Sequence, residues 1–66
     1  MKITIDKETD TLYFRFDESK IVESEEVRPG VILDFDDKDS VVGVEFLNVS
    51  SRATQEELLN MQFQLV

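Results

Sequence analysis

Apolar and polar residues alternate along two stretches of the chain, which is the pattern of β-strands that bury one face. The first stretch predicts strands over 2–6 and 11–16, and the second predicts strands over 31–36 and 41–48. Each pair of strands is joined by a four-residue loop, which is an ordinary hairpin connection. The sequence therefore predicts two antiparallel hairpins.

The loop lengths also fix a register in which apolar residues face one another across each hairpin. A slip of one residue would turn these side chains to the other face, so the apolar pattern specifies the pairing strongly. On the opposite face, Asp34 lies across from Gly43, and the missing side chain there leaves room for a close neighbour. The expected apolar pairs are Ile3 with Phe14, Ile5 with Leu12, Val31 with Phe46, Leu33 with Val44, and Phe35 with Val42.

The segment 21–28 carries a weaker strand pattern, because glutamates occupy both of its faces. Charged side chains are typical of strands at the edge of a sheet, where they oppose aggregation. We expect an edge strand here, ended by a type II turn at Pro29-Gly30.

After residue 50 the pattern changes from strand to helix. Thr54 and Glu57 have the spacing of a capping box, which predicts a helix from Gln55 to about Gln62. Residues 62–66 also alternate between polar and apolar, so a terminal strand is an alternative for them.

Together these elements predict an α+β domain with a small antiparallel sheet of four to five strands. The single domain would span residues 1–66, with the sheet in 1–48 and the helix in about 54–62. The C-terminal helix would pack on one face of the sheet through Leu58, Leu59 and Met61.

Composition narrows the classes of function. The 66 residues carry a net charge of −8 and contain neither cysteine nor histidine, so disulfides and thiolate or imidazole metal sites are excluded. An acidic chain is repelled by phosphate backbones and by anionic membranes, so we expect no direct nucleic-acid or membrane binding. We expect a cytoplasmic protein without a cofactor, and the charge favours a basic protein partner or, as the simpler explanation, solubility.

Carboxylates around the second hairpin are the only candidates for metal or acid–base chemistry. Asp34, Asp36 and Glu45 are weak cation-binding candidates, but a calcium loop needs a third oxygen ligand where Lys38 stands and a glycine where Asp39 stands. A hairpin loop explains these aspartates better, and no nucleophile–base pair accompanies them. We therefore expect no enzymatic activity.

The outer face of the sheet is the better candidate for a binding site, because one helix cannot cover both faces. Tyrosine and arginine on that face are residue types enriched at protein interfaces. A protein partner would use this face or the acidic edge, and a twofold homodimer is the alternative that needs no other protein. The predicted partner-binding residues are Tyr13, Arg15, Ile32 and Leu47 on the outer face, with Glu23 and Glu25 on the acidic edge.

Three segments of the chain resemble the bacterial and archaeal family known as domain of unknown function 2283. The segment Asp10-Thr11-Leu12-Tyr13 is similar to the family's Asp-Ala-Leu-Tyr pattern. Gly30 to Asp36 is similar to its Gly-Val-Ile-Leu-Asp-Tyr-Asp run, and Val42 to Leu47 with Ser50 to its Val-Gly-Ile-Glu-Ile-Leu and serine. The resemblance covers most of residues 1–52, and the helical tail matches least.

The resemblance implies no established activity. It implies a small stand-alone protein with an antitoxin-type or chaperone-like role, because relatives lie beside small toxin-like genes. This expectation agrees with an acidic domain that binds a basic partner.

Overall fold

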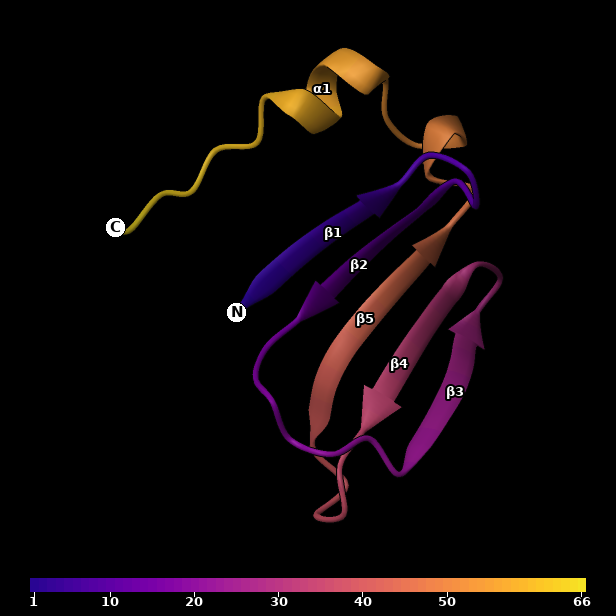
Figure 1. Ribbon diagram of the computed structural model, residues 1–66, viewed down its shortest axis with the longest axis vertical. Helices are drawn as coiled ribbons and strands as arrows, with labels where there is room; N and C mark the ends of the chain where they lie inside the picture. Colours follow the sequence, from indigo (N-terminus) through magenta and orange to yellow (C-terminus); the bar gives the residue numbers. More distant parts are fainter.

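The computed structural model describes residues 1–66 and contains one five-stranded antiparallel sheet, a single 3₁₀ turn and one short α-helix (Figure 1). This arrangement confirms the predicted α+β class. The elements are β1 (Lys2–Asp6), β2 (Thr11–Arg15), β3 (Glu23–Arg28), β4 (Val31–Phe35), β5 (Val41–Leu47), the 3₁₀ turn η1 (Val49–Ser51) and α1 (Gln55–Leu59).

The strand order is β1-β2-β5-β4-β3, which places β5 at the centre and β1 and β3 at the two edges. The predicted registers are confirmed where Ile5 pairs with Leu12, and Leu33 with Val44. The predicted edge position of β3 is also confirmed. Apolar cross-strand pairs stabilise the register that they define. This explains why the alternation of apolar and polar residues was sufficient to predict these strand pairings.

The predicted pairing of Phe35 with Val42 is wrong. Phe35 pairs with Val41, and the register shifts between Asp34 and Phe35. Such a shift inserts one extra residue into β5, which is a β-bulge. Val42 is the extra residue, is only 2% exposed, and its carbonyl accepts a hydrogen bond from the amide of Phe16.

A second irregularity shapes the turn between β3 and β4. Arg28 pairs with Val31 across Pro29-Gly30, and Gly30 has a φ of 78°, as the third position of a type II turn requires. Type II turns fit the twist of a hairpin poorly. The register shift between Glu26 and Arg28 adjusts β3 to this turn.

Helix α1 begins as predicted but ends early. The side chain of Thr54 accepts a hydrogen bond from the amide of Glu57, and the Glu57 side chain accepts one from the amide of Thr54, which completes the capping box. The helix ends at Leu59, before the predicted Gln62, because Asn60 leaves the helical conformation. The last six residues adopt neither a helix nor the alternative terminal strand.

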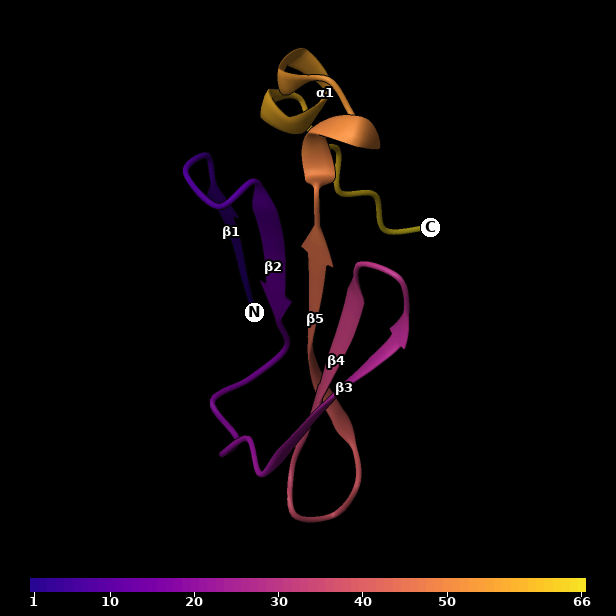
Figure 2. The same ribbon diagram turned by 90° about the vertical axis from the view of Figure 1, so that its right-hand side faces the viewer.

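The sheet forms a single layer, and no second layer covers either of its faces (Figure 2). Val42 and Val49 are the only buried hydrophobic residues. Helix α1 lies beyond the strand ends and reaches the sheet at one corner, beside Ile5, while Leu59 remains 73% exposed (Figures 1 and 2). No helix of the structure is both long and apolar enough to cross a membrane.

Candidate functional site

Strand pairing separates the side chains of the sheet into two chemically different faces. Residues that pair across neighbouring strands point to the same side of the sheet, so each set of paired residues lies on one face. The apolar face consists of Ile3, Ile5, Leu12, Phe14, Val31, Leu33, Phe35, Val41, Val44 and Phe46. The polar face consists of Lys2, Thr4, Asp6, Thr11, Tyr13, Arg15, Ser24, Glu26, Ile32, Asp34, Gly43, Glu45 and Leu47.

A hydrogen-bonded network around Asp34 occupies the centre of the polar face. The Tyr13 hydroxyl donates to one carboxylate oxygen of Asp34 at 2.7 Å, and the Ser24 hydroxyl donates to the other at 2.6 Å. Asp34 is only 9% exposed, and a buried carboxylate needs such donors to offset its lost hydration. The network connects β2, β4 and β3 across the sheet.

Gly43 makes this network sterically feasible. It lies on β5 opposite Asp34, and a Cβ atom there would stand 2.5 Å from the Tyr13 hydroxyl and 3.0 Å from a carboxylate oxygen of Asp34. The absence of a side chain thus lets the tyrosine ring cross β5 and reach its acceptor. This result confirms the prediction that a neighbour packs closely over Gly43.

The environment of Tyr13 keeps its hydroxyl protonated. Burial raises the pKa of the Tyr13 phenol above its ordinary value of 10.0, and the hydrogen bond to Asp34 raises it further. The neighbouring Arg15 opposes this shift only in part. At neutral pH the phenol is therefore a donor to Asp34 and cannot act as a general base.

A second polar pair ties the β1–β2 turn to the segment after β5. Asp10, with a φ of 57°, accepts hydrogen bonds on its two carboxylate oxygens from the Ser50 amide at 3.1 Å and the Ser50 hydroxyl at 2.6 Å. Its backbone carbonyl accepts a third bond, from Val49. These contacts hold η1 against the sheet and bury Val49.

The predicted partner-binding residues divide between the two faces. Tyr13, Arg15, Ile32 and Leu47 all lie on the polar face, so the structure brings them together there. Two of them have internal partners: the tyrosine bonds to Asp34, and Arg15 donates to the backbone carbonyls of Asp17 and Ser19.

Glu23 and Glu25 lie elsewhere. They pair with Phe35 and Leu33, which places them along the rim of the apolar face, where both are exposed. They do not converge with Asp34, because Asp34 pairs with Ser24 and lies on the opposite face of the sheet.

The weak cation candidates also have separate surroundings. Asp34 accepts from Tyr13 and Ser24, whereas Asp36 accepts from the amides of Lys38 and Ser40 in the β4–β5 turn. Glu45 pairs with Ile32, two residue pairs away from the pair of Asp34 and Gly43. No group of three or more acidic side chains is close enough to hold a metal ion.

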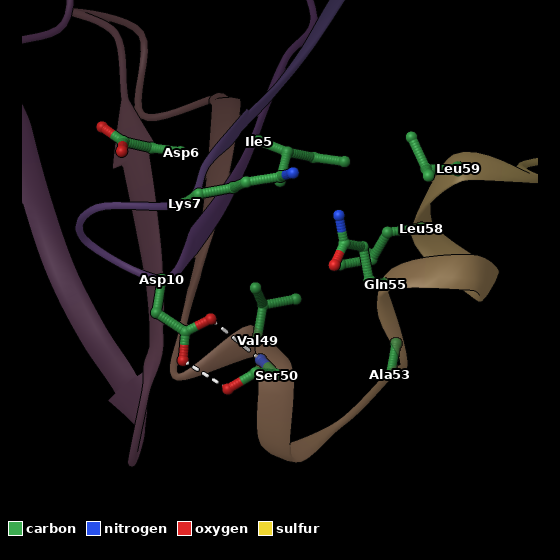
Figure 3. Close-up of a pocket in the computed structure, with 10 residues that line it drawn as sticks. All are labelled: Ile5, Asp6, Lys7, Asp10, Val49, Ser50, Ala53, Gln55, Leu58 and Leu59. Carbon is green, nitrogen blue, oxygen red and sulfur yellow. Dashed lines mark hydrogen bonds between the residues drawn. The ribbon is translucent and has the colours of Figure 1, made fainter.

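A surface hollow of about 450 Å³ lies where α1 meets the first hairpin (Figure 3). Ile5, Val49 and Leu58 supply its apolar wall, and Asp10 and Lys7 stand at its polar side (Figure 3). The Asp10 carboxylate is engaged by Ser50. The hollow is therefore an open corner between the helix and the sheet, with no convergent set of free polar groups.

Ser24 is the network residue that the sequence pattern missed. The weak pattern of 21–28 left its register open, and only pairing with β4 places Ser24 opposite Asp34. A lone serine among glutamates carried no other signal.

The fold and the site together define a small acidic domain built on a single-layered antiparallel sheet with a polar network across one face. The family model described as "Protein of unknown function (DUF2283)" matches residues 2–50 of the 66-residue chain, which thus belongs to this family. The matched residues include the network around Asp34 and the pair of Asp10 and Ser50, and the match ends before α1. No curated protein and no solved structure matches the chain.

Proposed function

We propose that this protein is a non-catalytic, protein-binding module whose apolar face is covered by a protein partner. The observation that carries the proposal is a five-stranded sheet with an apolar face and no layer over it. Stable domains bury such a face against a second layer, because it is otherwise exposed to water. With only two buried hydrophobic residues, this chain gains its missing layer by binding.

The charge distribution supports a basic partner. The chain carries a net charge of −8, and Glu23 and Glu25 form an exposed acidic rim beside the apolar face. Such a rim would steer a basic protein to the face and would accept an added strand along the open edge of β3. An antitoxin-like role in the cytoplasm, as the partner of a small basic protein, fits this chemistry.

Self-association is the second candidate, and the same uncovered face favours it. The polar face is a weaker candidate surface, because its central tyrosine and arginine already have partners within the chain. Cation binding is the least supported, since the carboxylates of Asp34 and Asp36 both accept hydrogen bonds within the fold.

A pull-down from native lysate at low salt, read by mass spectrometry, tests the proposal. Leu33 and Ile32 provide a matched pair of variants, because they are neighbours on β4 and belong to opposite faces. Leu33→Lys is expected to lose the partner, while Ile32→Lys keeps it. Circular dichroism shows whether each variant is folded. If the folded Ile32→Lys variant loses the partner while Leu33→Lys keeps it, the binding surface lies on the polar face and the proposal is overturned.

A further inference from the structure

We propose that residues 60–66, the segment after α1, form a strap that closes over the first hairpin's share of the apolar face while no partner is bound. This share consists of Ile3, Ile5, Leu12 and Phe14 on β1 and β2. The inference rests on the proposed function, because the strap occupies part of the surface that the partner would cover. The partner must displace the strap, which therefore weakens the binding of the partner.

The composition of the strap differs from that of a solvated tail. Residues 58–66 are the longest stretch of the chain without a charged side chain, although 33% of all residues are charged. Segments that remain in solvent are typically rich in charged residues and poor in aromatic ones. Phe63, Leu65 and Val66 are nevertheless all exposed in the structure. An exposed apolar segment of this kind is stabilised when it covers an apolar surface.

The order of residues in the strap suits a segment that lies flat on a sheet. Apolar and amide side chains alternate along it, so an extended strap has an apolar side and an amide side. The apolar side consists of Met61, Phe63 and Leu65, and the amide side consists of Gln62 and Gln64. The apolar side would pack on the sheet, while the amide side and the backbone remain in contact with water.

The strap begins next to the surface that it covers and lies on the same side of the sheet. Ile5, a residue of the apolar face, lines the hollow together with Leu58 and Leu59 of α1 (Figure 3). From α1 the strap continues on the right of β1 and β2 in Figure 2 and runs outside the β1 edge in Figure 1. Asn60, which leaves the helical conformation at the end of α1, is the point about which the strap would turn toward the sheet.

The strap is long enough to cover the first hairpin. Its seven residues span about 23 Å when they are extended. Strands β1 and β2 have five residues each, which is about 17 Å, and neighbouring strands lie about 5 Å apart. The closed strap therefore reaches Ile3 and Phe14 without crossing β5. The second hairpin's share of the face, around Leu33, stays open beside the acidic rim, where a basic partner can make its first contact.

A disulfide trap tests whether the strap closes. The chain has no cysteine, so Leu65→Cys can be combined with Ile3→Cys or with the control Thr4→Cys, which lies on the opposite face of β1. A disulfide requires two Cα atoms within about 7 Å of each other. After mild oxidation of a dilute sample, the chain with Ile3→Cys is expected to form about tenfold more intramolecular disulfide than the control. Mass spectrometry of the monomer measures the bond, and circular dichroism shows that both chains are folded.

A matched pair of strap variants tests closure without changing the sheet. Phe63→Asp/Leu65→Asp alters the apolar side and Gln62→Asp/Gln64→Asp the amide side, and each changes the net charge from −8 to −10. Nile red, an uncharged dye that fluoresces on apolar surfaces, is expected to give a stronger signal with the first variant than with the parent chain or the second variant. In the low-salt pull-down, the first variant should capture about threefold more of the partner than the second.

Equal disulfide formation with Ile3→Cys and Thr4→Cys, or equal Nile red fluorescence in the two strap variants, would overturn the closure of the strap. Equal or weaker capture by Phe63→Asp/Leu65→Asp would overturn its competition with the partner and leave the proposed function standing. A strap that closes in a chain that captures no protein would instead remove the proposed function and leave the strap as an intramolecular cover of the face.

Discussion

At the scale of single residues, the polar face depends on a glycine that allows a tyrosine to reach an aspartate. Gly43, Tyr13 and Asp34 come from three strands, and only the folded register brings them together. The sequence placed Gly43 opposite Asp34 and anticipated a close neighbour over it. It did not identify that neighbour, because the tyrosine pairs with Glu45 and reaches Asp34 diagonally.

We expect Gly43→Ala and Tyr13→Phe each to lower the free energy of unfolding by about 1–3 kcal/mol, the usual cost of leaving a buried polar group without its partner. Both changes disturb the same hydrogen bond, since the added Cβ would displace the tyrosine hydroxyl. The double variant should therefore cost less than the sum of the two. Urea unfolding of the four chains gives this coupling, and strict additivity would show that the glycine acts independently of the tyrosine.

Because the pKa of Tyr13 is raised, we also expect the folded chain to lose stability at alkaline pH. The folded pKa of Tyr13 is raised above the ordinary value of 10.0, so the folded chain holds this proton more tightly than the unfolded chain does. The resulting stability is complete below pH 10 and is lost as the pH rises through the folded pKa. Urea midpoints measured from pH 8 upward should fall in the parent chain above pH 10 and fall less in Tyr13→Phe. An equal fall in both chains would contradict this role for Tyr13.

At the scale of elements, alternation predicted the strands and both hairpin registers because apolar pairs define them. The bulge was not predictable, since Val41 and Val42 are both valines and no pattern distinguishes which one pairs with Phe35. The helix was predicted too long because apolar residues continue beyond Leu59. In the structure these residues do not pack against the uncovered face of the sheet, and Phe63 remains 81% exposed.

Helix α1 should behave as a locally unstable element. We expect Thr54→Ala to remove the capping box and cost the helix about 1 kcal/mol, with almost no change in the unfolding of the sheet. Amide hydrogen exchange checks this directly: Leu58, whose amide bonds to the Thr54 carbonyl, should exchange faster, while Val44 should not. Equal acceleration at both amides would show that the helix and the sheet unfold together.

At the scale of the whole molecule, net charge opposes the homodimer that self-association through the uncovered apolar face would form. Two chains of charge −8 repel each other over long distances, and salt screens this repulsion within about 8 Å at 0.15 M. We expect the dimer to tighten roughly tenfold from about 0.01 to about 0.15 M NaCl, as measured by sedimentation equilibrium. A complex with a basic protein should weaken over the same range. Weakening of the dimer would show that attraction between opposite charges at its interface outweighs the net repulsion.

The strand order has a consequence for how the chain folds. Each hairpin joins neighbouring segments and can form quickly, but β2 and β5 are far apart in the sequence and meet only when the two hairpins dock. The β2–β5 pairing is thus the slow, long-range step, and the bond between Tyr13 and Asp34 forms only after it. Until docking, β5 is an open edge rather than the centre of the sheet. In the cell, aggregation would compete with folding during that interval, and the glutamates of β3 lie only one strand away from the exposed edge.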